Sequence, residues 1–327
     1  MAVTGAEGFI GSHLVETLVA SGQRVRAMVQ YNSFGFHGWL ESLPDEALAS
    51  VDIVMGDVRD AGSVLAFMQD AEVVYHLAAL IAIPYSYLAP RSYLDTNAGG
   101  TLNVLEAART LGTPRVVHTS TSEVYGTARS VPITEEHPLQ GQSPYSASKI
   151  AADKLAESYH LSFGLPVVTL RPFNTFGPRQ SARAVIPTII SQAAAGEEEI
   201  HLGLLTPTRD FTFVRDTAAA FVAAGTAPTD RVTGRVLNAG TGREISIGDL
   251  VATIGAIMDR PIRAVEDERR LRPEGSEVMR LLSDASALQE ATGWTSAHTL
   301  EEGLRETVAW FGDPENLARY RWQDYNV

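Results

Sequence analysis

Three glycines near the start of the chain constrain its fold more than any other feature. Residues 3–11 read Val-Thr-Gly-Ala-Glu-Gly-Phe-Ile-Gly, which places Gly5, Gly8 and Gly11 in a GxxGxxG pattern. The flanking residues predict a strand over Ala2–Thr4 and a helix over Ile10–Ser21. Between a strand and a helix, such glycines permit a tight turn and a close approach of the backbone to a pyrophosphate, and the helix N-terminus offers free N–H groups. The segment therefore predicts a dinucleotide-binding unit.

The rest of the first half alternates short β-rich runs with helical stretches. Such alternation is typical of an α/β fold in which a Rossmann-type, doubly wound parallel sheet carries helices on both faces. Further strands are expected at Arg24–Val29, Val51–Met55, Val73–Leu77, Arg115–Thr119 and Pro166–Arg171, and further helices at Leu102–Leu111 and Ser146–Phe163.

After Pro172 the pattern changes to shorter elements separated by prolines. We interpret residues 1–172 as the dinucleotide-binding domain and residues 173–327 as a smaller C-terminal substrate domain. The segment at about 209–238 is expected to return to the first domain, so the two domains are interleaved. An amphipathic helix is predicted at Leu300–Phe311.

The composition excludes several classes of function. The chain has no cysteine, which excludes disulfides, thiolate metal sites and a cysteine nucleophile. A net charge of −13 disfavours nucleic acid as a partner. No apolar run reaches the roughly 18 residues of a membrane span, and no signal peptide is visible, so we expect a cytoplasmic enzyme. The eight histidines lack metal-ligand spacing, so no metal is expected.

The most specific chemical motif is the YxxxK pattern formed by Tyr145 and Lys149. Residues four apart share one face of a helix, so the ammonium is expected to lower the pKa of the phenol. A phenolate is a good base for a sugar hydroxyl. Only two of the 26 basic residues are lysines, which makes the position of Lys149 informative.

Thr121, Ser122 and Glu123 follow a predicted strand, at the sheet edge where α/β proteins place their chemistry. Thr121 is a candidate hydrogen-bond partner for a sugar hydroxyl, and Glu123 is a candidate base. Asp57-Val58, after the third predicted strand, is a candidate adenine-binding pair.

One feature of dinucleotide folds is missing. The end of the second predicted strand usually carries an acidic residue for the ribose hydroxyls. Here residues 28–33 read Met-Val-Gln-Tyr-Asn-Ser, with no carboxylate. The choice between NAD and NADP is therefore open at this point.

Together, GxxGxxG, His76-Leu77-Ala78-Ala79, Asn97, Ser120-Thr121, YxxxK and Arg171-Pro172-Phe173-Asn174 resemble the extended short-chain dehydrogenases/reductases of the NAD-dependent epimerase/dehydratase family. The resemblance covers almost the whole chain. It implies NAD as cofactor, with NADP not excluded, and a homodimer formed through helices near Thr101–Thr110 and Ser146–Tyr159. The expected cofactor-binding residues are Gly5, Gly8, Phe9, Ile10, Gly11, Gln30, Asn32, Ser33, Asp57, Val58, Leu77, Ala78, Ala79, Asn97, Tyr145 and Lys149.

Within this family the chain most resembles nucleotide-sugar 4,6-dehydratases of the legionaminic-acid type. Tyr145-Ser-Ala-Ser-Lys149 and Glu123-Val-Tyr-Gly126 carry the resemblance to 4,6-dehydratases in general. The resemblance to the legionaminic-acid type, which acts on nucleotide-activated N-acetylglucosamine, rests on residues 30–39, 79–87, 120–126 and 177–183. The dTDP-glucose 4,6-dehydratases have aspartate where Ser122 stands. The expected catalytic residues are Thr121, Ser122, Glu123, Tyr145 and Lys149.

A nucleotide-diphosphate sugar needs local positive charge in such an acidic protein, and guanidinium groups match phosphate geometry. The expected substrate-binding residues are Tyr85, Asn174, Arg179, Arg183, Arg209 and Arg272. Three alternatives stay open at this point: a 4-epimerase, an NDP-glucuronate decarboxylase, and a non-catalytic regulator that senses NAD(P).

Overall fold

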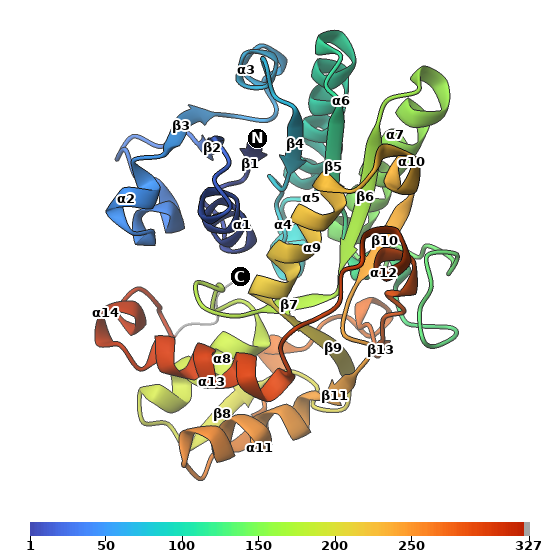
Figure 1. Ribbon diagram of the computed structural model, residues 1–327. Helices are drawn as coiled ribbons and strands as arrows, with labels where there is room; N and C mark the ends of the chain where they lie inside the picture. The colour runs from blue at the N-terminus through green and yellow to red at the C-terminus, as the bar shows by residue number, and fades with distance from the viewer. Residues whose placement is uncertain (324–327) are drawn as a thin grey trace.

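The computed structural model describes residues 1–323 and contains a seven-stranded parallel sheet (Figure 1). Its spatial order is β3-β2-β1-β4-β5-β6-β10, so the chain starts near the middle and proceeds first to one edge and then to the other. The strands are β1 (Ala2–Thr4), β2 (Val25–Gln30), β3 (Val51–Gly56), β4 (Val73–His76), β5 (Arg115–Thr119), β6 (Val167–Pro172) and β10 (Val236–Ala239).

Helices cover both faces of this sheet. On one face α1 (Phe9–Ala20) packs against α9 (Val214–Thr226), above a core that includes Leu14, Val117 and Phe221. The other face carries α3 (Ala61–Phe67), α6 (Gly100–Leu111) and α7 (Pro144–Phe163) over a second core. Two covered faces on a parallel sheet confirm the predicted doubly wound fold.

The second region lies beyond the carboxyl ends of the central strands (Figure 1). Its core contains Phe176, Ile189, Phe213, Ile254 and Leu304. Its strands are β7 (Asn174–Phe176), β9 (Thr208–Phe213), β11 (Glu244–Ser246) and β13 (Arg280–Leu281) in one sheet, with β8 (Glu199–Leu202) and β12 (Arg263–Glu266) in another. Its main helices are α8 (Val185–Ala194), α11 (Ile247–Met258) and α13 (Leu300–Phe311).

The chain crosses between the two regions more than once. It enters the second region at β7, returns to the first with α9 and β10, and leaves again at β11. Later, α12 (Ser286–Thr292) packs against β10 and α9. The remaining short elements are α2 (Asp45–Leu48), α4 (Ile83–Leu88), α5 (Pro90–Tyr93), α10 (Thr229–Val232), α14 (Pro314–Leu317), η1 (Gly38–Ser42), η2 (Leu94–Gly99), η3 (Ser122–Tyr125), η4 (Glu268–Arg270) and η5 (Glu274–Ser276).

Two helices begin earlier than the sequence predicts. The stretch predicted from Leu102 is preceded by α5 and by η2, a π-helix that leads directly into α6. The helix predicted from Ser146 begins at Pro144, because Ser143 caps its N-terminus and exchanges hydrogen bonds with Ser146. Within residues 1–323, none of the helices has the length and apolarity needed to cross a membrane.

Candidate active site

The glycine loop forms a narrow cradle at the N-terminus of α1. Gly5 has a φ of +67°, and a Cβ at this position would lie 2.7 Å from the Ala78 backbone nitrogen. A Cβ on Gly11 would lie 2.1 Å from the Gly5 carbonyl oxygen. Gly8 is the N-cap of α1, so the N–H groups of the first helical turn, beginning at Phe9 and Ile10, have no carbonyl partner within the helix. This arrangement fits a pyrophosphate.

The opposite wall of the cradle is the segment Leu77–Ala79, after β4. Thr4 Oγ1 contacts His76 Nδ1 at 2.9 Å and accepts a hydrogen bond from the Ala78 N–H at 3.2 Å. Thr101 contacts the other ring nitrogen of His76 at 3.1 Å. The buried His76 therefore fixes the ends of β1 and β4 beside the cradle.

Asn97 lies behind this wall and not on its surface. Its side chain is fully buried and exchanges two hydrogen bonds with the Leu80 backbone, each 2.9 Å long, while its Nδ2 also donates to Ser148. Direct cofactor binding was the expectation for Asn97. Cofactor binding by Asn97 stays a prediction. In this structure both N–H groups of the side chain are engaged within the protein, and Oδ1 accepts one hydrogen bond, from the Leu80 N–H. Asn97 positions the loop that follows Ala79.

The residues that are expected to surround the adenosine lie together at the ends of β2 and β3. Asn32 organises the loop after Gln30, because its Oδ1 accepts hydrogen bonds from the backbone nitrogens of Phe34 and Phe36, and Ser33 is exposed within that loop. Arg59 bonds to Asp57 and holds the pKa of that carboxyl below its usual value. The Val58 side chain is buried, and a shallow hollow borders Asp57.

The residues predicted to be catalytic lie where β5 and η3 approach α7. Thr121 caps η3 by accepting a hydrogen bond from the Glu123 N–H, and it also hydrogen-bonds to Tyr145. Ser122 is buried and Glu123 is half-buried. The structure thus brings together Thr121, Ser122, Glu123, Tyr145 and Lys149 from two elements.

The pKa of Tyr145 departs from the sequence prediction. Burial raises the pKa of the phenol, and the nearby Glu123 carboxylate adds to that shift, while the hydrogen bond with Thr121 opposes it. The sequence predicted a pKa lowered by Lys149. The predicted direction is therefore wrong, because burial outweighs the effects that would lower the pKa. The Lys149 ammonium donates a hydrogen bond to the Thr119 carbonyl at 2.6 Å. Burial also lowers the pKa of Lys149 to about 8.

The site is also supported by a buried network of charged residues, which the sequence analysis did not predict. Asp153 accepts hydrogen bonds from Ser120 at 2.7 Å and from Arg171 at 2.9 Å, and it contacts His118 Nε2 at 3.0 Å. Burial alone raises the pKa of Asp153, but its hydrogen bond with His118 and the Arg171 charge outweigh this and keep the pKa low. Asp153 lies four residues after Lys149, and this spacing was the available signal.

Arg209 and Arg272 form the positive side of the site. Arg209 is buried, lies 3.4 Å from Glu277 and donates a hydrogen bond to the Thr208 carbonyl. Arg272 approaches the same Glu277 oxygen at 3.9 Å, so two guanidinium groups share one carboxylate. On β7, the Oδ1 of Asn174 is buried without a hydrogen-bond partner. The two guanidinium groups share one carboxylate, and the Asn174 oxygen has no hydrogen-bond partner, so both features fit a polar ligand.

Arg179 lies elsewhere. It is buried against α1, where it lies 3.1 Å from Glu16 and 3.4 Å from Ser12. His13 Nε2 contacts the preceding Pro178 carbonyl at 3.0 Å and fixes this turn on the helix. Substrate binding by Arg179 stays a prediction, and in this structure its ion-pair partner is Glu16 of the first region.

Tyr85 and Arg183 lie near Tyr93, which in turn packs against Tyr145. The Tyr93 ring stands edge-on to Tyr145 at a centroid distance of 6.2 Å, and the Tyr85 ring lies 6.2 Å from the Tyr93 ring. Burial raises the pKa of Tyr93, and the positive charge of the exposed Arg183 lowers it in part. Tyr85 and Arg183 are therefore placed at the rim of the site.

Glu123 couples the catalytic pair to the arginines. It is the charged group that contributes most to raising the Tyr145 pKa. Burial lowers the pKa of Arg209, and Glu123 is the foremost group opposing that change. One carboxylate thus stands within electrostatic range of the catalytic phenol and of the buried guanidinium.

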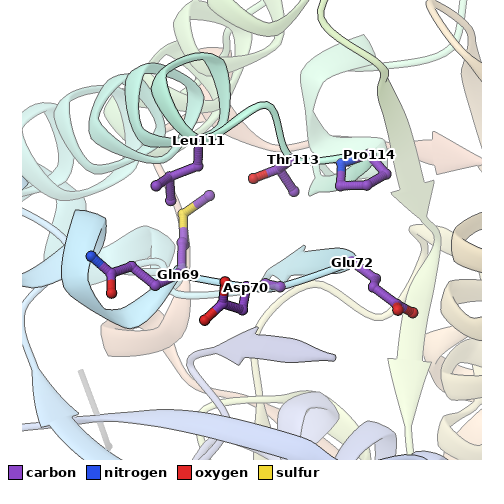
Figure 2. Close-up of a pocket in the computed structure, with 8 residues that line it drawn as sticks. Gln69, Asp70, Glu72, Leu111, Thr113 and Pro114 are labelled. Atoms are coloured by element: carbon purple, nitrogen blue, oxygen red, sulfur yellow. The ribbon is translucent and has the colours of Figure 1, made fainter.

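A separate pocket lies at the opposite edge of the sheet. Figure 2 shows it between the turn before β4, which includes Asp70 and Glu72, and the turn before β5, which includes Thr113 and Pro114. The carboxylates of its rim would repel a phosphate group. We therefore assign the chemistry to the carboxyl edge of the sheet, where Tyr145 lies.

Comparison with known proteins identifies the family. The family model described as GDP-mannose 4,6 dehydratase matches residues 2–307. The chain belongs to this family. It is accordingly an extended short-chain dehydrogenase/reductase of the NAD-dependent epimerase/dehydratase type, as the joint motifs indicated.

Relatives of this dehydratase-family enzyme include more than one activity. A dTDP-glucose 4,6-dehydratase of Xanthomonas campestris pv. campestris is 33% identical, over 94% of this chain and 92% of the relative. A UDP-glucose 4-epimerase of Mycolicibacterium smegmatis is 35% identical, over 94% and 97%. The solved dTDP-glucose 4,6-dehydratase DesIV of Streptomyces venezuelae, which contains NAD, has a TM-score of 0.83 at 27% identity and covers 98% of both chains.

Proposed function

We propose that this enzyme is an NAD-dependent nucleotide-sugar 4,6-dehydratase that forms a 4-keto-6-deoxy sugar. GDP- or UDP-N-acetylglucosamine is the first substrate to test, on the resemblance to legionaminic-acid enzymes. The observation that carries the proposal is that the Glu123 carboxylate follows β5 on η3, beside α7, close enough to act on the pKa of both Tyr145 and Arg209. Dehydration needs a second base beyond the tyrosine, and Glu123 is an ionisable side chain suited to that task.

The glycine cradle supports NAD as cofactor. A Cβ at Gly5 or Gly11 would clash with the backbone of Ala78 or of Gly5, so only glycine permits the tight turn that leads into the N-terminus of α1. Residues of the loop, of Leu77–Ala79 and of the β2 and β3 ends would hold the dinucleotide. NAD, when bound, supplies a hydride acceptor for C4 of the sugar, a hydride donor for C6 and, in its oxidised form, a positive charge.

Tyr145 carries the proton at C4 in this mechanism. Its phenolate accepts the proton of the C4 hydroxyl, and Thr121 keeps the phenol oriented through their hydrogen bond. Lys149, with a pKa of about 8, is mostly charged at neutral pH and stabilises the anionic tyrosine electrostatically. Oxidation at C4 gives a ketone that acidifies the hydrogen at C5.

Glu123 then completes the elimination. Its carboxylate removes the C5 proton and passes it to the hydroxyl that leaves C6, so the departing group is water and no proton is lost. Ser122 orients that hydroxyl and is too weak an acid to donate the proton itself. When C6 has been reduced, a proton from solvent is added at C5 in place of the one that left with the water. Tyr145 releases to solvent the proton that it took from the C4 hydroxyl, so the 4-keto-6-deoxy sugar is complete and the phenolate is restored.

The arginines support a nucleotide diphosphate as the activating group. Arg209 and Arg272 share Glu277, so a bound diphosphate would supply the negative charge that this cluster lacks. Asn174 would donate to the ligand through its amide nitrogen, and Arg183 and Tyr85 would contact it at the rim.

We also propose a homodimer, supported by exposed Leu102 on α6 and Leu161 on α7.

A 4-epimerase is the second candidate. It is favoured by the 35% identity to the UDP-glucose 4-epimerase, and Thr121, Tyr145 and Lys149 serve either reaction. Epimerisation does not need Glu123, which is why we prefer dehydration.

The test is a panel of UDP-, GDP-, dTDP- and CDP-hexoses, including the N-acetylglucosamine forms, with products identified by NMR. The proposal predicts a 4-keto-6-deoxy product, which absorbs in alkali. A product that differs from its substrate only in configuration at C4 contradicts dehydration and establishes the epimerase.

A further inference from the structure

The adenosine end of the cofactor cradle holds a carboxylate that does not come from β2. In dinucleotide folds, an acidic residue near the end of the second strand binds the ribose hydroxyls. Here β2 ends at Gln30 and is followed by Tyr31 and Asn32. The structure places Glu7, from the middle of the glycine loop, at this same strand end.

Backbone contacts from two segments fix Glu7. Its Oε1 oxygen accepts a hydrogen bond of 2.9 Å from the Gln30 N–H, and its main-chain carbonyl accepts one of 3.0 Å from the Trp39 N–H. Gly38, with a φ of +61°, approaches so closely that a Cβ there would lie 2.7 Å from the Glu7 Cβ. The position of the carboxylate is therefore determined by the loop and by residues 30–39.

The second oxygen of the same carboxylate has no protein partner. Glu7 Oε2 is buried and makes no hydrogen bond, although a buried carboxylate oxygen is costly to leave unpaired. Burial raises the pKa of Glu7, and the hydrogen bond from Gln30 opposes the change. An unsatisfied acceptor beside a nucleotide cradle indicates that a ligand donor completes it.

We propose that Glu7 is the residue that selects NAD over NADP, by accepting a hydrogen bond from an adenosine ribose hydroxyl and by repelling a 2′-phosphate. The inference rests on the dinucleotide site of the proposed function and adds its specificity. Arg26, the basic residue of β2, does not offset the charge of Glu7 at this end, because it is bound to Asp52 at 2.9 Å and to the Phe67 and Gln69 carbonyls at 3.0 Å.

The test measures dissociation constants of NAD and NADP by titration calorimetry on protein stripped of nucleotide, for the wild type and for Glu7→Gln. Glu7→Gln removes the charge-assisted hydrogen bond to the ribose hydroxyl and the repulsion of a 2′-phosphate. The preference for NAD should therefore fall by roughly ten- to a hundredfold. Glu46→Gln is the matched control, since it removes the same charge from exposed α2 and should leave the preference unchanged.

Two outcomes separate this inference from the proposed function. If wild-type protein binds NAD and Glu7→Gln keeps the full preference, Glu7 is not the selector, although the cofactor proposal stands. If wild-type protein binds neither dinucleotide, the cofactor proposal itself fails. Should Glu7→Gln not fold, Glu7→Asp replaces it: the shorter carboxylate should weaken NAD binding while still rejecting NADP, and unchanged NAD affinity would contradict the assignment.

Discussion

At the residue scale, Tyr145 stands in surroundings that oppose the charge its proposed chemistry requires. Burial and Glu123 both favour the neutral phenol. Tyr145→Phe removes the hydroxyl and little volume, so turnover should fall by roughly 100- to 10,000-fold while nucleotide-sugar affinity stays near that of the wild type. Steady-state kinetics measures the turnover, and calorimetric titration with the nucleotide sugar measures the affinity. Near-normal turnover would show that another group carries the C4 proton.

Burial of the charged Lys149 is predicted to lower the free energy of unfolding, although the proposed chemistry requires this residue. Its pKa is lowered from 10.5 to about 8 in the folded protein, so between these values the unfolded chain binds more protons and stability rises with pH. Below pH 8 the full burial cost applies, on the order of 3 kcal/mol. Lys149→Met should therefore be inactive yet more stable at pH 7, by about 1–3 kcal/mol after loss of the Thr119 hydrogen bond.

Urea denaturation at pH 7 and pH 10 measures this effect. The gain of Lys149→Met over the wild type should shrink at pH 10, where the buried lysine is mostly neutral in the folded state. Equal destabilisation at both pH values would contradict the assigned burial cost.

At the scale of elements, the turn from β1 to α1 should tolerate no added methyl group. A Cβ on Gly11 would meet the Gly5 carbonyl oxygen at 2.1 Å, and backbone cannot give way as a flexible side chain can. We expect Gly11→Ala to lose bound NAD, measured by nucleotide release on denaturation and by thermal unfolding. Gly275→Ala is the control, because nothing lies within 4 Å of its Cβ position. Retention of full cofactor content by Gly11→Ala would contradict the cradle.

Local patterns predicted most of the elements of the first region. The alternation of β-rich and helical stretches predicted α7, and the four-residue spacing of Tyr145 and Lys149 predicted that their side chains share one of its faces. The glycines indicated the turn between β1 and α1. Contacts between distant segments were not predictable in this way. Arg179 is neutralised by Glu16, which lies 163 positions earlier, and Glu7 meets Gln30 only because β1 and β2 are paired. The π-helix before α6 has no local signature in the sequence.

At the scale of the whole molecule, the proposed dimer involves α6 and α7, which lie side by side (Figure 1). Leu161 is 76% exposed on α7 and Leu102 is 38% exposed on α6. Burial of an apolar side chain contributes roughly 1.5–3 kcal/mol, so Leu102→Glu or Leu161→Glu should weaken association at least about tenfold. Sedimentation velocity over a concentration series measures this. Met55→Glu, on the edge strand β3, is the control, and an unchanged dimer in both leucine variants would place the interface elsewhere.

The central claim is that one site oxidises C4, eliminates water across C5 and C6, and returns the same hydride to C6. The most direct test is turnover of the accepted nucleotide hexose carrying deuterium at C4, with the product examined by NMR and mass spectrometry. The account predicts a 4-keto-6-deoxy sugar with the deuterium at C6, and it predicts that Glu123→Gln reduces bound cofactor but forms no such product. Deuterium that remains at C4, or dehydration by Glu123→Gln at the normal rate, would contradict it.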